Sequence, residues 1–178
     1  MTTESTAVQP HTEKLHKLGA SDAMVDFFSD YDSLQAAWDA CTNVSLMLWL
    51  LGRTEKSKPY SEARKPLVRA CLECARTEWE YMPQTGRACI ELHERWCNGE
   101  SIVPDQLRAA GDAAIIWAFT RPSGKVTDFC VTDTGVSRVA GASADDLAYW
   151  SFKSACHFFH PECADIVRRH FPTAPELP

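Results

Sequence analysis

The sequence NVSLMLWLLG, residues 43–52, contains an apolar run of six residues, Leu46–Leu51. Asn43 is a residue type that caps the N-terminus of a helix, and Gly52 is a type that ends one. A run of this length is far shorter than the roughly 20 residues that a membrane-spanning helix needs. We therefore predict a core helix here, with Trp49 buried, so that Trp49→Ala lowers the free energy of unfolding by about 3–5 kcal/mol.

The segments on both sides of this run repeat a helical spacing. Apolar residues, cysteines and a histidine recur three and four residues apart, as on one face of an α-helix. These sets are Met24, Val25 and Phe28; Leu34, Trp38 and Cys41; Leu67, Ala70, Cys71 and Cys74; Cys89, Ile90, His93, Trp96 and Cys97; and Leu107, Ala110, Ala114 and Trp117. Ser33 can cap the second of these helices, and Pro104 and Pro161 suit first helical positions. The pattern predicts an all-α protein, a bundle of six to eight helices.

Residues 122–142 depart from the helical pattern. Their β-favouring residues are Val126, Phe129, Val131, Val136 and Val139. Because Asp133-Thr134-Gly135 can form a tight turn, we predict a small β-hairpin or a structured loop inserted into the bundle. The same triplet is the core motif of aspartic proteases, but those enzymes need a β-barrel and a second aspartate, so we interpret it as a turn.

The length of 178 residues suits one ordinary domain. We expect residues 1–20 to form a polar N-terminal arm, residues 21–172 a single helical domain, and residues 173–178 a C-terminal tail. Within the arm, Thr12–Leu18 can form a turn of helix that Gly19 ends. The N-terminus lacks the basic and then apolar pattern of a secretory signal, so we expect a cytoplasmic protein with reduced cysteines.

Two groups of cysteines and histidines have the residue types that zinc prefers. The first consists of Cys71, Cys74, Cys89, His93 and Cys97, and the second of Cys156, His157, His160 and Cys163. If the helices that carry the first group are antiparallel neighbours, four ligands could converge on one ion. The alternative is that these side chains fill the core, because a free cysteine behaves as a small apolar residue. We favour the alternative and expect no cofactor, and we keep a zinc-binding protein or metal-dependent enzyme as the second hypothesis.

The motifs of covalent catalysis and phosphate binding do not occur in this sequence. It has neither a Gly-x-Ser-x-Gly elbow nor a glycine-rich phosphate loop. Cys97 and His93 lie one helical turn apart and could form a thiolate–imidazolium pair, but we interpret them as buried neighbours. We therefore expect a protein that is not an enzyme.

The segment from residue 53 to residue 76 is basic, although the whole chain has a net charge of −6. It contains three glutamates and seven basic residues, which are Arg53, Lys56, Lys58, Arg64, Lys65, Arg69 and Arg76. The segment predicts a local basic surface for an acidic protein partner. Nucleic-acid binding through the same segment ranks last, because Tyr60 is the single aromatic residue among these basic ones.

Several stretches together resemble the immunity protein family, small helical proteins of bacteria and phages. The resemblance covers residues 33–118 and 144–172 and rests on stretches shared with that family. These are Trp49-Leu50-Leu51-Gly52-Arg53, Arg64–Cys71, Ile90-Glu91, Glu94–Gly99 and Cys163–Pro172. It implies an all-helical protein that binds and masks another protein without catalysis of its own. Residues 122–142 depart from the family, in which a continuous alanine-rich helical stretch stands at this place.

The leading hypothesis is therefore a non-enzymatic binding protein. It would be an immunity-type or phage-borne inhibitor, anti-CRISPR-like for example, that neutralises a toxin or a host-defence effector by masking its surface. The basic residues of segment 53–76 are its predicted partner-binding residues, and we expect no interaction with a membrane.

Overall fold

The computed structural model describes residues 10–120, 136–143, 146–147 and 162–178. Within these ranges every regular element is a helix, which confirms the predicted all-α fold class. The α-helices are α1 (Pro10–Lys17), α2 (Asp22–Ser29), α3 (Leu34–Ala40), α4 (Val44–Thr54), α5 (Lys65–Arg76), α6 (Gln84–Cys97), α7 (Pro104–Thr120) and α10 (Glu162–His170), and two short 3₁₀ turns are η1 (Glu62–Arg64) and η2 (Trp79–Tyr81). None of the helices in the described ranges is both long enough and apolar enough to cross a membrane.

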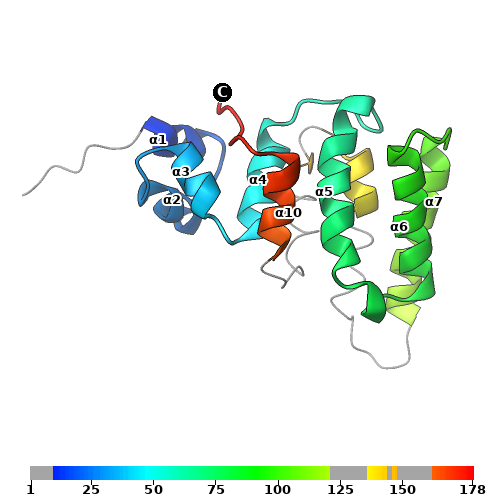
Figure 1. Ribbon diagram of the computed structural model, residues 1–178. Coiled ribbons are helices and arrows are strands. Elements are labelled where there is room, and N and C mark those ends of the chain that lie inside the picture. Colours follow the sequence, from blue (N-terminus) through cyan, green and yellow to red (C-terminus); the bar gives the residue numbers. More distant parts are fainter. Residues whose placement is uncertain (1–9, 121–135, 144–145, 148–161) are drawn as a thin grey trace, which may run out of the picture.

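Helices distant in sequence lie side by side in the bundle (Figure 1). The C-terminal helix α10 lies between α4 and α5 and contacts both. On the far side of α5, α6 packs between α5 and α7, while α1, α2 and α3 form the opposite end of the molecule. The last helix of the chain therefore closes the bundle.

The helices begin where the sequence predicts caps. The Ser33 hydroxyl accepts a hydrogen bond from the Ala36 N–H at 3.1 Å, and the Asn43 side chain accepts one from the Ser45 N–H at 3.0 Å. Each cap satisfies an N–H group that has no partner within its helix. Gly52 was expected to end α4, but the helix continues to Thr54 with Gly52 buried inside it.

The apolar run of α4 does not place Trp49 in the core. Its buried residues are Val44, Met47, Leu48, Leu50, Leu51 and Gly52. Trp49 is only partly buried, and the Arg53 guanidinium lies 5.5 Å from the centre of its ring. The prediction of a buried Trp49 is therefore wrong. Among the tryptophans whose burial the structure describes, Trp38 of α3 is fully buried, and its indole N–H donates to the Phe171 carbonyl at 3.0 Å.

The described part of the predicted β insertion is helical. Residues 136–141 form a short helix with Val136 and Val139 buried, so the strand prediction is wrong for both valines. The two valines lie three residues apart, on one face of this helix, and their burial against the bundle outweighs the β preference of valine. This helix approaches α7 closely, since a Cβ added at Gly111 would lie 2.3 Å from the Ser137 hydroxyl oxygen. The remaining predicted insertion, with the Asp-Thr-Gly triplet, lies outside the described residues.

The expected turn of helix within the N-terminal arm is part of a longer helix that packs against the bundle. Residues 10–17 form α1, which packs against α2 and buries Leu15 completely. The predicted helix end at Gly19 is confirmed, with a φ of +81°. The C-terminal tail lies against this end of the molecule, because the Lys14 ammonium donates to the Leu177 carbonyl at 2.9 Å.

Candidate protein-binding surface

The structure does not bring the seven basic residues of segment 53–76 onto one surface. Four of them are exposed, namely Arg53, Lys56, Lys58 and Arg69. Arg64 is fully buried and Lys65 is 5% exposed, so neither can contribute to a surface that meets a partner. Lys65 pairs with Glu62 at 2.7 Å. The exposed basic surface is therefore smaller than the sequence predicts.

Arg64 has a structural role instead. Its guanidinium donates from Nε to the Ser57 hydroxyl at 2.8 Å, and from Nη1 to the carbonyls of Val139 at 2.9 Å and Ala142 at 3.2 Å. Burial lowers the pKa of Arg64, and the nearby Glu55 opposes that shift. The side chain thus ties the loop before α5 to the 136–142 segment.

An ordered cluster of arginine and aromatic residues stands at the turn between α5 and α6. The Arg76 guanidinium lies 3.7 Å from the centre of the Trp79 ring, and the Arg87 guanidinium lies 5.3 Å from it. The Arg76 Nε donates to Glu94 Oε1 at 2.7 Å, so an ion pair holds this stack in place. We call Arg76, Trp79, Tyr81 and Arg87 the α5–α6 corner.

Tyr81 makes this corner distinctive. It is 71% exposed, and the other large apolar residue exposed in the described part of the chain is Val103, at 56%. Tyrosine, tryptophan and arginine are the residue types that most often dominate the binding energy of protein interfaces. The ring of Trp79 is already ordered by its two guanidiniums, so less conformational entropy is lost on binding. The corner therefore suits contact with another protein.

Sequence reasoning did not identify the corner. The available signal was Trp79-Glu80-Tyr81, two aromatic residues in a polar stretch between two helices. A tryptophan between two predicted helices is normally interpreted as a core residue. The structure has a 3₁₀ turn here, in which Trp79 is partly buried against the core and Tyr81 is exposed.

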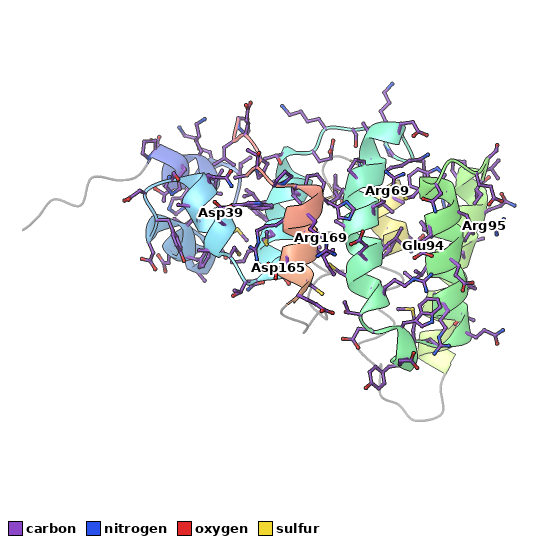
Figure 2. The ribbon with its side chains drawn as sticks, viewed as in Figure 1. Asp39, Arg69, Glu94, Arg95, Asp165 and Arg169 are labelled. Carbon is purple, nitrogen blue, oxygen red and sulfur yellow. The ribbon has the colours of Figure 1, made fainter. Side chains whose placement is uncertain are left out.

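The face formed by α10, α5 and α6 carries charges of both signs (Figure 2). Arg169 Nη2 lies 3.0 Å from Glu73 Oε2, and His170 Nε2 lies 2.9 Å from Glu73 Oε1. Arg168 pairs in the same way with Asp165 at 2.6 Å. Because positive groups are matched by carboxylates, this face lacks the basic excess that a phosphate backbone requires.

The structure separates the cysteines and the histidine of the first predicted metal group. Cys74 lies next to Cys163 of α10, whose carbonyl is 3.7 Å from the Cys74 sulfur, while Cys89 and His93 meet within α6. Cys71 and Cys97 are buried as well. In the described ranges, no three Cys, His, Asp or Glu side chains are grouped so that they could hold a metal ion. From the second predicted group, Cys156, His157 and His160 lie outside those ranges.

The environment of Cys97 and His93 disfavours a reactive ion pair. Burial raises the pKa of the Cys97 thiol to about 11, which keeps it protonated near neutral pH. Burial also lowers the pKa of His93, whose Nδ1 donates to the Cys89 carbonyl at 2.8 Å. Its Nε2 is buried without a hydrogen-bond partner. The imidazole is therefore a neutral group of the core.

His93 should make the protein less stable in mild acid. The pKa of the unfolded histidine is about 6.5, and the folded pKa lies below it. Above pH 6.5 neither state is protonated at this residue; as the pH falls below 6.5, the unfolded state takes up the proton first, so folding stability falls. The slope from one group is at most about 1.4 kcal/mol per pH unit.

The measurement is the free energy of unfolding in urea at pH 7.5 and pH 5.0, for the wild type and for His93→Asn. The asparagine amide can still donate to the Cys89 carbonyl, but it does not titrate. The wild type should lose more stability between the two pH values than the variant. An equal loss in both proteins would mean that His93 does not resist protonation.

No family model matches the chain, and no curated protein or solved structure matches it either. The chain combines a protonated Cys97 thiol and a neutral His93 imidazole in its core with an exposed tyrosine beside an ordered arginine–tryptophan stack.

Proposed function

We propose that this protein is a non-enzymatic binding protein, an immunity-type inhibitor that masks the surface of a toxin or a host-defence effector. The observation that carries the proposal is Tyr81, 71% exposed at a corner where Trp79 and two arginines are already ordered. The resemblance of the sequence to immunity proteins supports the same class of function. This function needs no metal or cofactor, and its site of action would be the cytoplasm.

The corner would supply most of the binding energy. Tyr81 can insert into an apolar pocket of the partner, and Arg87 can hydrogen-bond to carboxylates or carbonyls around that pocket. Arg87 already donates from Nε to the Met82 carbonyl at 2.9 Å, which fixes its direction. Each contact would contribute more binding energy if the partner excludes water from this cluster than if the cluster lies at the solvent-exposed edge of the interface.

The exposed basic residues would act on the rate of association. Arg53, Lys56 and Lys58 precede α5, whereas the corner begins at Arg76, the last residue of α5. A helix of 12 residues is about 18 Å long, so the two groups do not form one contact patch. Surface charges outside the contact area attract an oppositely charged partner over about 10 Å at moderate salt. The proposed partner is therefore acidic near its binding site.

Replacing Tyr81 by serine tests the proposal. Affinity purification of the tagged protein from its producing cells should recover one stoichiometric protein partner, and Tyr81→Ser should reduce its recovery at least about tenfold. The matched control is Val103→Ser, which removes the other large apolar side chain exposed in the described residues, 56% exposed, in the connection between α6 and α7. Both substitutions are at the surface and should change the free energy of unfolding by less than about 0.5 kcal/mol.

The two variants distinguish specific binding at the corner from non-specific apolar association. Loss with Tyr81→Ser and retention with Val103→Ser supports the proposal. Equal recovery with all three proteins would exclude the corner as the binding site, and equal loss with both variants would indicate non-specific apolar association.

A further inference from the structure

A polar cavity of about 180 Å³ lies on a different part of the molecule from the α5–α6 corner. It is bounded by the loop before α5, by α7 and by the 136–143 segment. The polar side chains that line it are Tyr60, Arg108, Ser137, Arg138, Ser143 and Asp146. Two guanidiniums and three hydroxyls thus face one carboxylate in the lining.

Tyr60 is held in a conformation that L-residues rarely adopt. Its φ is +54°, in the left-handed region. The strained backbone is fixed by a hydrogen bond from the Tyr60 N–H to the Ala140 carbonyl at 2.9 Å and by edge contact with Trp96 at 6.3 Å between ring centres. A bulky residue keeps such a conformation only where its surroundings impose it, and such residues cluster at functional sites.

The position of Tyr60 brings its hydroxyl to the cavity. The ring lies over Gly141, where an added Cβ would be 2.3 Å from the hydroxyl oxygen, so a glycine is needed for this approach. Tyr60 lines the cavity, and its phenolic hydroxyl can donate and accept a hydrogen bond. It is therefore available as a donor to a bound molecule.

The two arginines of the lining come from different elements. Arg108 of α7 contacts Asp105 at 3.1 Å, and Arg138 contacts Asp112 at 3.4 Å, each through one carboxylate oxygen. The four side chains are all more than 40% exposed, and such pairs contribute little to stability. A guanidinium has five N–H donors, so each arginine can also serve a ligand in the cavity.

Several hydrogen bonds connect the wall of the cavity to the rest of the bundle. Buried Arg64 holds the carbonyls of Val139 and Ala142, and the Ser137 hydroxyl donates to the Leu107 carbonyl at 3.1 Å. The Asp146 carboxylate accepts a hydrogen bond from the Ser143 hydroxyl at 2.8 Å, which reduces its repulsion of an anion.

We infer that this cavity binds a tetrahedral oxyanion of the phosphate class. One planar carboxylate is satisfied by a single guanidinium, whereas a tetrahedral anion presents oxygens in several directions. Two guanidiniums from separate elements and the Tyr60 hydroxyl can approach the oxygens of a tetrahedral anion from different directions. The anion can be free phosphate or the phosphate group of an ester.

Calorimetric titration of the full-length protein at constant ionic strength tests the inference. The probes are inorganic phosphate, phenyl phosphate and acetate. We expect saturable binding of one phosphate per chain, at least about tenfold tighter than that of acetate. Arg108→Gln and Arg138→Gln should each weaken phosphate binding about tenfold or more, as expected for the loss of a charge-assisted hydrogen bond. Tyr60→Phe, which removes only the hydroxyl, should weaken it by a smaller factor.

The matched control is Arg95→Gln, which removes an exposed arginine paired with Glu100 at the end of α6. This variant should bind phosphate as the wild type does. Tighter binding of phenyl phosphate than of phosphate would identify an ester as the ligand, and equal binding would identify the free anion. Absence of saturable phosphate binding, equal binding of acetate, or equal loss with Arg95→Gln would overturn the inference.

Discussion

Replacing Trp38 by alanine should lower the free energy of unfolding by about 3–5 kcal/mol. The side chain is fully buried, so its loss leaves a large cavity beneath α3. Its indole N–H also donates to the Phe171 carbonyl at 3.0 Å, and alanine would leave that carbonyl without this donor. Because Phe171 follows α10, the substitution also loosens the contact between the two ends of the chain. Urea denaturation followed by circular dichroism measures the effect.

Trp49→Ala is the matched control for this prediction. Trp49 is only partly buried, and one face of its ring is covered by the Arg53 guanidinium. The buried apolar surface lost with the Trp49 side chain is smaller than that lost with Trp38. We therefore expect the free energy of unfolding to fall by about 1–2 kcal/mol. If Trp49→Ala destabilised the protein as much as Trp38→Ala, the assignment of the inner face of α4 would be incorrect.

The sequence predicts helices well where local chemistry decides their ends. Ser33 and Asn43 cap helices as expected, since a cap depends on the side chain and on N–H groups two or three residues later. Pro104 begins α7 and Gly99 adopts a φ of +94° after α6, as their residue types suggest. These features involve residues that are neighbours in sequence.

Helix faces are harder to predict where the pattern is uniform. In the run Leu46–Leu51 every residue is apolar, so spacing alone does not say which residues point inward. The structure selects Met47, Leu48, Leu50 and Leu51 because α10 packs against that side of α4. This contact involves residues more than 100 positions later, and the local sequence contains no information about it.

The candidate sites depend still more on tertiary contacts. In the sequence, Arg64 is one of the seven basic residues of segment 53–76 and is predicted to be a surface charge. It is buried because it donates to the carbonyls of residues 139 and 142, which are far from it in the sequence. The polar cavity combines Tyr60, Arg108 and Arg138 from three separate segments. No spacing rule joins such residues, so the sequence analysis identified neither the cavity nor the strained tyrosine in its wall.

Arg64→Ala should be the other strongly destabilising substitution, with a loss of about 3–5 kcal/mol in the free energy of unfolding. The guanidinium is fully buried, and its removal leaves the carbonyls of Val139 and Ala142 without a donor. Arg64→Lys should recover only part of the loss, because one ammonium cannot reach both these carbonyls and the Ser57 hydroxyl.

Arg53→Ala is the control for the loss of a positive charge, since Arg53 is exposed in the same segment. It should cost no more than about 1 kcal/mol, the typical energy of its exposed contact with Trp49. Urea denaturation of the three variants and the wild type distinguishes the roles. Should Arg64→Ala unfold at the wild-type urea concentration, the guanidinium would have to be solvated, and the 136–142 segment would need another attachment to the bundle.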